Sequence, residues 1–427
     1  MIRFSDRTVH RADRGSTQAR YCDAESGLFL VTVGHGANGV LATSQALWTF
    51  EEHADDLGQF ARGCRDVLDR VPVDVAREAL DAAFQTASQR AYEDGKNNAE
   101  VAADLSAVLV GEGVVFLAHV GASSIYLLRD GRTEPLTRAH VIAESLKDTG
   151  YDFREDTVPS RYLQVISRGI GIRPTVDPDI HTMDVLPGDR ILLASQSLEE
   201  LIEPEALVKA AARSDIDDAT AALIEQLVTT RGDRDLTVVL IEPPASGRAQ
   251  AAVAEARAMG GLFLFEGLPF RSRLRANQLF GRISFQPGDT IVSEGERGQA
   301  MYVVVEGEVV VSRGGLEVAR LGPGTHFGEL ALADDSPRAA TVKGVGDGEL
   351  TSIDREHLDR FCRQEPDLGI ELLWKLIGWV GGQLKDMSDR RQAPPRPRKK
   401  AAAKPAKKAA AKPAKKTAAR PPKKAGS

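Results

Sequence analysis

Short apolar runs alternate with amphipathic stretches over the first 243 residues, and this pattern predicts a mixed α+β domain. Strands are predicted at 27–33, 107–120 and 124–131. The tripeptides Gly-Glu-Gly and Arg-Asp-Gly punctuate the last two of these runs, which indicates hairpins. Apolar residues recur at i, i+3 and i+4 in helices predicted at 73–95 and 217–232. We therefore expect an antiparallel sheet system covered by helices, in a layered sandwich.

The pattern changes after residue 243. An Ala-rich stretch predicts a connecting helix, and the strands that follow are short and punctuated by glycine, as in a small β-barrel or jelly roll. A helical stretch is expected at 354–384. The predicted parts of the chain are a layered domain at 1–243, a linker helix at 244–260, a β-roll with flanking helices at 261–392 and a tail at 393–427.

Composition narrows the class of protein. Hydrophobic residues at 42% and charged residues at 27% fit a soluble globular protein. No apolar run reaches the roughly 18 residues needed to span a bilayer, and the first residues lack the apolar segment of a secretory signal. The cysteines, Cys22, Cys64 and Cys362, are too widely spaced for a zinc cluster or a disulfide framework. We expect a cytoplasmic location.

The net charge of −6 averages two unlike parts. Residues 393–427 hold 13 basic side chains and no acidic one; removing them from the total of 55 leaves 42 basic against 61 acidic residues, a net charge of −19. The tail repeats AAAKPAKK and resembles the C-terminal tails of linker histones. We expect it to be disordered in isolation. Its partners are either DNA or RNA phosphates, through sequence-independent attraction, or the chain's own acidic body.

One segment, FGELALADDSPRAATV at 327–342, combines the residue types that hold a small anionic ligand. Gly328 permits close backbone approach, and the ELAL segment can form a short helix whose first N–H groups face an anion. Glu329 can accept hydrogen bonds from a sugar hydroxyl. Arg338 can offer a charge-assisted fork to a phosphate. The alternative is a barrel in which this arginine and glutamate pair with each other.

This segment resembles the phosphate-binding cassette of cyclic nucleotide-binding domains, and the resemblance extends over roughly 262–385. It implies that Glu329 binds the ribose 2′-hydroxyl and Arg338 the cyclic phosphate. Backbone groups complete the cradle at Gly328, Glu329, Leu330 and Ala339. In the family, Thr or Ser after the arginine favours cGMP. Because Ala339 stands there, the resemblance implies cAMP as the ligand, with cGMP less favoured. Candidates for covering the base are Trp374 and Trp379, with hinge or core positions as the alternative.

The N-terminal region resembles the metal-dependent protein phosphatases (PPM, type 2C), an α-β-β-α sandwich. The six segments that carry the resemblance, in order, are 5–16, 28–39, 118–140, 168–174, 186–202 and 234–241. Such enzymes hold two divalent metals through carboxylates, and the metals activate a water against a phosphate ester.

Most of those carboxylates are absent from this chain. Val33 stands where the family has the bridging Asp, and valine offers no ligand. The other replacements are Gly15-Ser16 at the opening Glu-Asp, Ala122 and Ala139 in the hairpin blocks, Gln196-Ser197 after the Leu-Leu-x-Ser strand, and Arg234-Asp235 at the closing block. Asp13, Asp233 or Asp235 can replace a missing ligand if the register slides. We predict no catalytic residue, no metal ligand, and no bound Mg or Mn.

Arg11 falls where the family binds the substrate phosphate, so it either binds a phosphorylated partner or is an exposed strand residue. The histidines His35, His119 and His140 are predicted to be structural. The leading hypothesis is a cyclic-nucleotide-responsive regulatory protein with a catalytically dead, protein-binding phosphatase-like domain. The alternatives are a cyclic-nucleotide-regulated, metal-dependent serine/threonine phosphatase, and a nucleic-acid-associated protein that acts through its tail.

Overall fold

The computed structural model describes the chain except for residues 10–16, 65–69, 96–100, 149–164, 199–200, 231–234, 246, 248, 278, 334–336 and 393–427. The predicted basic tail therefore lies outside the described residues. Contacts divide the chain into two compact units, Met1–Val380 and Gly381–Ser427. Among the helices of the described ranges, none is long and apolar enough to cross a membrane. The predicted boundaries at 243, 260 and 392 stay predictions.

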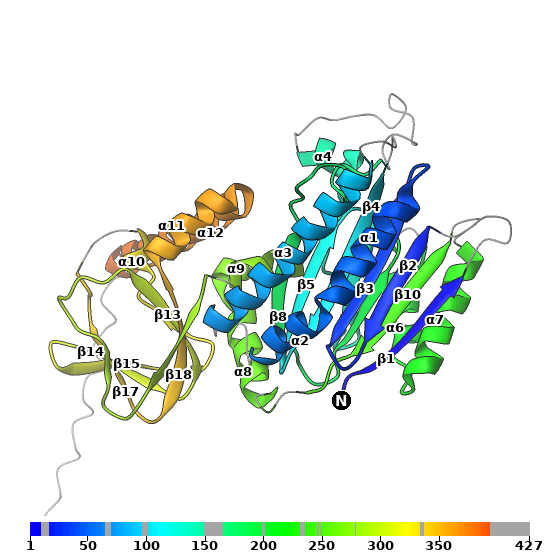
Figure 1. Cartoon of the computed structure of the whole chain (residues 1–427). Helices are drawn as coiled ribbons and strands as arrows, with labels where there is room; N and C mark the ends of the chain where they lie inside the picture. The colour runs from blue at the N-terminus through cyan, green and yellow to red at the C-terminus, as the bar shows by residue number, and fades with distance from the viewer. Residues whose placement is uncertain are drawn as a thin grey trace, which may run out of the picture. The chain divides into compact units, whose positions relative to one another are not determined.

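In its described residues, the N-terminal region contains two antiparallel five-stranded sheets (Figure 1). The first has the strand order β1 (Arg3–Val9), β10 (Leu236–Glu242), β9 (Arg190–Ala194), β6 (Ser124–Arg129) and β7 (Arg132–Pro135). The second has the order β2 (Gln18–Asp23), β3 (Leu28–His35), β4 (Ala102–Val110), β5 (Val114–Val120) and β8 (Asp179–Asp184).

The two sheets stack face to face, and helices cover both outer faces. Phe29 of β3 and Ile241 of β10 belong to one apolar cluster between the sheets. The helices on the second sheet are α1 (Gly39–Glu52), α2 (Ala54–Arg62) and α3 (Arg70–Gly95); those on the first are α6 (Pro204–Ala211) and α7 (Ile216–Thr230). Between α1 and α3, the rings of Phe50 and Phe84 pack edge to face, with centroids 5.2 Å apart. The expected α+β, α-β-β-α sandwich is confirmed. A short helix, α4 (Ile142–Asp148), follows β7.

The central strands of the second sheet contain long apolar runs because both faces of this sheet are covered by other elements. Every residue of β5 is buried, and so is nearly all of β4, because one face meets the other sheet and the opposite face meets helices. The predicted hairpin at 107–120 is confirmed, but β4 begins earlier, at Ala102. Its pairing with β3 continues to Ala102 opposite His35, and the early part includes the buried, charged Asp104, which the hydrophobic pattern does not anticipate.

The end of β3 is fixed against the start of α1 by two glycines. A Cβ at Gly34 would lie 2.4 Å from the backbone of Gly39, and one at Gly39 would lie 2.4 Å from the backbone of Gly34. No side chain fits at that separation, so strand and helix approach as closely as backbone allows. This contact holds the neighbouring side chains of Val33 and His35 at the strand end.

The predicted β-roll is confirmed after a connecting helix, α8 (Ala249–Gly260). One sheet has the order β11 (Gly281–Phe285), β18 (Gly348–Asp354), β13 (Ala300–Glu306) and β16 (His326–Phe327). The other has the order β12 (Thr290–Val292), β17 (Thr341–Gly344), β14 (Val309–Arg313) and β15 (Leu316–Leu321). Helical segments at the start of the domain are η1 (Phe263–Phe265) and α9 (Phe270–Asn277).

The helical stretch predicted at 354–384 is two helices, α11 (Arg355–Gln364) and α12 (Pro366–Gln392). Asp354 caps α11 by accepting a hydrogen bond from the backbone N–H of His357 at 2.8 Å. Pro366 then opens α12, where a missing N–H costs nothing. The buried side of α12 includes Leu368, Leu372 and Leu376, which contribute to the core of the β-roll domain.

Candidate functional site

The predicted cassette follows β16 and includes the four-residue helix α10 (Leu330–Ala333). Gly328 has φ +82°, a backbone conformation that favours glycine. The N–H of Ala331 donates to the carbonyl of Gly328 at 3.1 Å, and that of Leu332 to the carbonyl of Glu329 at 3.1 Å. The short predicted helix is therefore present. Leu330 is half exposed on it, at 51%, while residues 334–336 lie outside the described part of the chain.

Arg338 is held by backbone carbonyls rather than by a carboxylate. Its Nη1 donates to the carbonyl oxygen of Gly328 at 3.2 Å, and its Nη2 to that of Ala300 at 2.7 Å. The side chain of Arg338 thus contacts Gly328, at the start of the cassette. No ion pair with Glu329, the predicted alternative, is found among the described residues. Burial lowers the pKa of Arg338, and the nearby Tyr302 and Glu329 partly offset that shift.

Two glycines leave room for this guanidinium. A Cβ at Gly298 would lie 2.6 Å from Nε of Arg338, and a Cβ at Gly328 would lie 2.7 Å from its Nη1. Both separations are shorter than real side chains show. The residue that follows the arginine, Ala339, is exposed. The five predicted residues therefore form one local structure, and their binding of a nucleotide stays a prediction.

Glu329 is largely buried, with a side chain 16% exposed. Its Oε2 has no hydrogen-bond partner in the described part of the structure, and neither has Nδ1 of His326. These two atoms lie 3.7 Å apart, which is too long for a hydrogen bond. A buried carboxylate oxygen without a donor is costly, because it has given up water. The glutamate is thus available to an incoming donor.

The two tryptophans of α12 have different surroundings. Trp374 is 68% exposed. Trp379 stacks on Phe263 with ring centroids 5.3 Å apart and meets His326 edge to face at 5.5 Å. Of the two predicted roles, Trp379 therefore matches the core position, because its ring is engaged by two elements of the domain.

The N-terminal centre is the place where the metal ligands of the phosphatase-like fold are expected. Its predicted replacements that the structure describes are Val33, Ala122, Ala139 and Gln196-Ser197. Residues 10–16 and 231–234 are not described, so the predictions for Arg11, Asp13, Gly15-Ser16, Asp233 and Arg234 lie outside the described residues. Among the residues that are described, no group of three or more His, Cys, Asp or Glu side chains is placed to hold a metal. The donor set of the described residues alone does not make up a dinuclear carboxylate site.

A different polar pair lies beside Val33. Nε2 of His35 lies 3.2 Å from Oδ2 of Asp104, which also accepts the backbone N–H of Ala122 at 3.3 Å. Burial raises the pKa of Asp104, and His35 only partly offsets the shift. Burial acts to lower the pKa of His35, but the hydrogen bond and charge of Asp104 outweigh it, and the pKa is raised. Both shifts favour the protonated form of the group concerned.

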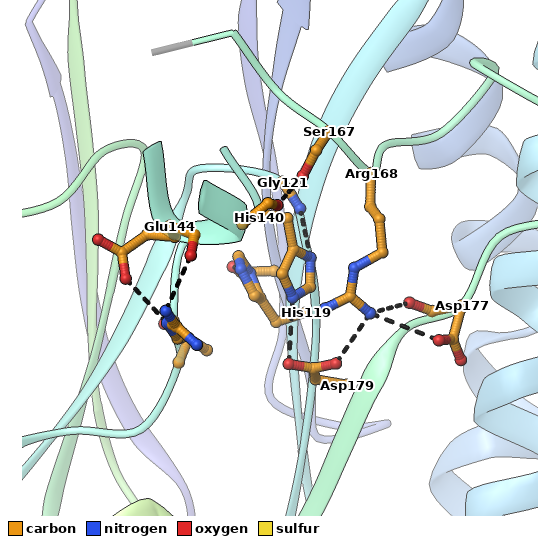
Figure 2. A network of polar contacts seen from close by, with 12 residues as sticks. His119, Gly121, His140, Glu144, Ser167, Arg168, Asp177 and Asp179 are labelled. Carbon is orange, nitrogen blue, oxygen red and sulfur yellow. Dashed lines mark hydrogen bonds and ion pairs between the residues drawn. The ribbon is translucent and has the colours of Figure 1, made fainter. Parts of the chain in front are cut away.

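A second His–Asp pair, formed by His140 and Asp179, lies next to Gly121 at the end of β5 (Figure 2). The N–H of Gly121 donates to Nδ1 of His140 at 3.2 Å, so the proton of this imidazole is on Nε2, which donates to Asp179 at 3.1 Å. Arg168 donates to the same carboxylate at 3.1 Å. Despite the burial of Asp179, His140 and Arg168 lower its pKa. Asp179 thus accepts hydrogen bonds from both His140 and Arg168, and His140 links this carboxylate to the backbone of Gly121.

His119 stacks on His140 with ring centroids 4.9 Å apart. Burial lowers the pKa of His119 to about 3, so the ring is neutral. Its Nδ1 is 3.0 Å from the hydroxyl of Ser106, and its buried Nε2 has no partner in the described structure. The structural role predicted for His35, His119 and His140 stays a prediction. No local sequence pattern marks Asp104 and Asp179, because the fold brings them to histidines 69 and 39 residues away.

Known proteins match both regions of the chain. Residues 282–365 match the family "Cyclic nucleotide-binding domain". This chain is similar to the cAMP-dependent protein kinase regulatory subunit of Dictyostelium discoideum, 39% identical over 88 residues (19% of this chain, 27% of that one), and to the cGMP-dependent protein kinase of Eimeria tenella, 46% identical over 77 residues (18% and 8%). The chain thus spans less than a third of the length of these relatives.

Among solved structures, the chain is similar to the PPM Ser-Thr phosphatase MsPP of Mycobacterium smegmatis: 29% identical, TM-score 0.46, covering 57% of this chain and 98% of that one. A second is the serine/threonine phosphatase PstP/Ppp of Mycobacterium tuberculosis: 23% identical, TM-score 0.45, covering 57% and 98%. With the β-roll, the cassette geometry and the family match in agreement, residues 282–365 of this chain are a cyclic nucleotide-binding domain.

Proposed function

We propose that this chain is a cyclic-nucleotide-responsive regulatory protein whose phosphatase-like domain binds a protein partner and does not hydrolyse phosphate esters. The arrangement of Arg338 and Glu329 carries the proposal. A half-buried guanidinium that donates to backbone carbonyls and pairs with no carboxylate in the described structure, and a largely buried carboxylate that accepts from no donor through Oε2, are complementary to one ligand with a phosphate and a hydroxyl. The ligand would be held in the cradle of Gly328, Glu329, Leu330 and Ala339.

cAMP is the favoured nucleotide. The side chain after Arg338 is the methyl group of Ala339, which is exposed and offers no hydroxyl to a guanine amino group. Relatives named for cAMP and for cGMP both match this domain, so the preference rests on this residue alone. Titration calorimetry of the full chain with each nucleotide tests it. Tighter binding of cAMP is expected, and absence of binding to either would overturn the proposed function.

Loss of catalysis is supported by the side chains at the N-terminal centre. Val33 supplies no ligand, and Asp104, which lies opposite it in the sheet, is already paired with His35. The surface of this domain would instead bind a protein, for which a phosphorylated one is a candidate. The nucleotide would bind one of two conformations of the chain more tightly than the other. Its binding would therefore change which conformation dominates. The location proposed for this function is the cytoplasm.

The alternative function is a metal-dependent phosphatase with non-standard ligands. One observation favours it: Oδ1 of Asp104 is buried and without a partner in the described structure, and carboxylate oxygens are the ligands that Mg²⁺ and Mn²⁺ prefer. A phosphopeptide assay with added Mn²⁺ discriminates between the two functions. No release of phosphate is expected. Release that EDTA abolishes would establish the enzyme.

The basic tail is proposed to bind DNA or RNA, in competition with the acidic body of the chain. With no aromatic residue between its lysines, its affinity would come from phosphate charge alone and fall steeply with salt. Deleting 393–427 is expected to abolish retention on DNA at low salt and to leave nucleotide affinity unchanged. Equal retention of the truncated and full-length chains would exclude the tail as the binding element.

A further inference from the structure

Glu329 and His326 present two unsatisfied polar atoms to each other inside the β-roll domain. Oε2 of the glutamate and Nδ1 of the histidine are both buried, and neither has a hydrogen-bond partner in the described structure. They lie 3.7 Å apart. A shift of less than about 1 Å would bring them to hydrogen-bonding distance. One atom accepts, and the other donates in one of the two neutral tautomers and in the charged form.

The imidazole of His326 is held by aromatic rings from outside the cassette. Phe263 of η1 lies 5.2 Å from it, Trp379 of α12 lies 5.5 Å from it, and these two rings stack on each other at 5.3 Å. On the next residue, Phe327 stacks on Tyr302 at 5.1 Å. The histidine ring is therefore wedged in place, and its Nδ1 lies beside the carboxylate.

A carboxylate that binds a ribose hydroxyl through one oxygen needs a donor for the other once the ligand has excluded water. We propose that His326 is a positioning residue, whose Nδ1–H donates to Oε2 of Glu329 and so turns the other oxygen toward the nucleotide. The rings of Phe263 and Trp379, which pack against the imidazole, fix the direction of that donor. This inference rests on the proposed function, because it concerns the same nucleotide site, and it adds a residue that the cassette motif does not contain.

The inference predicts an energetic coupling between His326 and the 2′-hydroxyl of the ligand. The probes are cAMP and 2′-deoxy-cAMP, titrated calorimetrically into the full chain. In the wild type, removal of the hydroxyl should weaken binding about 10- to 100-fold, as for a hydrogen bond to a charged group. His326→Phe keeps an aromatic ring between Phe263 and Trp379 but has no donor. In this variant, the ratio of the two dissociation constants should fall at least about fivefold.

His326→Asn and His326→Leu provide a size-matched pair if the phenylalanine variant folds poorly. The amide nitrogen of asparagine can take the place of Nδ1, so the asparagine variant should keep the wild-type ratio, while the leucine variant should lose it. Equal ratios for wild type, His326→Phe and His326→Leu would overturn the positioning role. Failure of the wild type to bind cAMP would overturn the proposed function instead, so the two failures are distinguishable.

Discussion

The cassette and the N-terminal centre treat buried charge in opposite ways. In the cassette, Arg338 donates its hydrogen bonds to backbone carbonyls and lies over the ring of Tyr302, and Glu329 keeps a buried oxygen without a donor. At the N-terminal centre, His35 pairs with Asp104 and His140 with Asp179, although Oδ1 of Asp104 and Nε2 of His119 are buried without a partner in the described structure. Charged groups that stay unpaired are costly to the fold until a ligand arrives, whereas oppositely charged groups that pair with each other need none. The difference in ion pairing therefore favours the cassette as the ligand site.

The strongest test of this contrast is Arg338→Ala. It should weaken cAMP binding about 100-fold, because two charge-assisted hydrogen bonds of roughly 1.5 kcal/mol each would be lost. Calorimetry measures the change. The control is Arg320→Ala on the same β-roll, an exposed arginine paired with Glu317 and Glu308, which should leave affinity unchanged. Equal affinities for Arg338→Ala and the wild type would remove the cassette from the proposed function.

Glu329→Gln should have a smaller effect, a loss of about 10-fold in cAMP affinity. The amide keeps the shape and one acceptor but loses the negative charge that strengthens the bond from the ribose. Glu317→Gln is the matched control, since Glu317 is half exposed on β15. If both variants bind like the wild type, the carboxylate of Glu329 has no part in nucleotide binding.

Ala339→Thr should raise cGMP affinity about fivefold and change cAMP affinity little, since one neutral hydrogen bond contributes about 1 kcal/mol. Ala339→Val has the same shape as the threonine variant without the hydroxyl and should show no gain. Competition binding with the two nucleotides measures the ratio. A gain in both variants would assign the effect to side-chain size.

The smallest effect is expected from the His35–Asp104 pair. Both pKa values are raised in the folded protein, so the folded state binds more protons than the unfolded chain, and the free energy of unfolding falls as pH rises. The contribution of His35 is complete below its ordinary pKa of 6.5 and is lost as pH rises through the raised value. His35 is one-third exposed, so screening limits the change to about 1 kcal/mol.

Asp104→Asn should flatten this dependence, because the imidazole then has no carboxylate to pair with. Urea unfolding at a series of pH values above 6 measures the slope for each variant. Asp56→Asn, on the exposed side of α2, is the control and should keep the wild-type slope. An identical slope in Asp104→Asn would show that the pair does not hold the extra proton.

The sequence predicted one of these sites better than the other for a physical reason. Gly328, Glu329 and Arg338 lie within eleven residues, so local backbone geometry brings them together and a motif records it. The same holds for the hairpins and for the helices α3 and α7. Asp104 reaches His35 only through the register of β3 and β4, and nothing near Asp104 in the sequence signals that pairing. His326, in turn, acquires its role from rings at Phe263 and Trp379.

The two glycines around Arg338 have a consequence for surveys of related chains. At Gly298 an added methyl group would meet only the tip of the arginine side chain, which can swing away at little cost to folding. At Gly328 it would meet the arginine and would also strain a backbone with φ +82°. A related chain with alanine in place of Gly298 would keep its fold, its glutamate and its arginine, and would still lose the ligand. Counting charged residues would score such a chain as intact, so the absence of a side chain at these positions is as informative as the charges themselves.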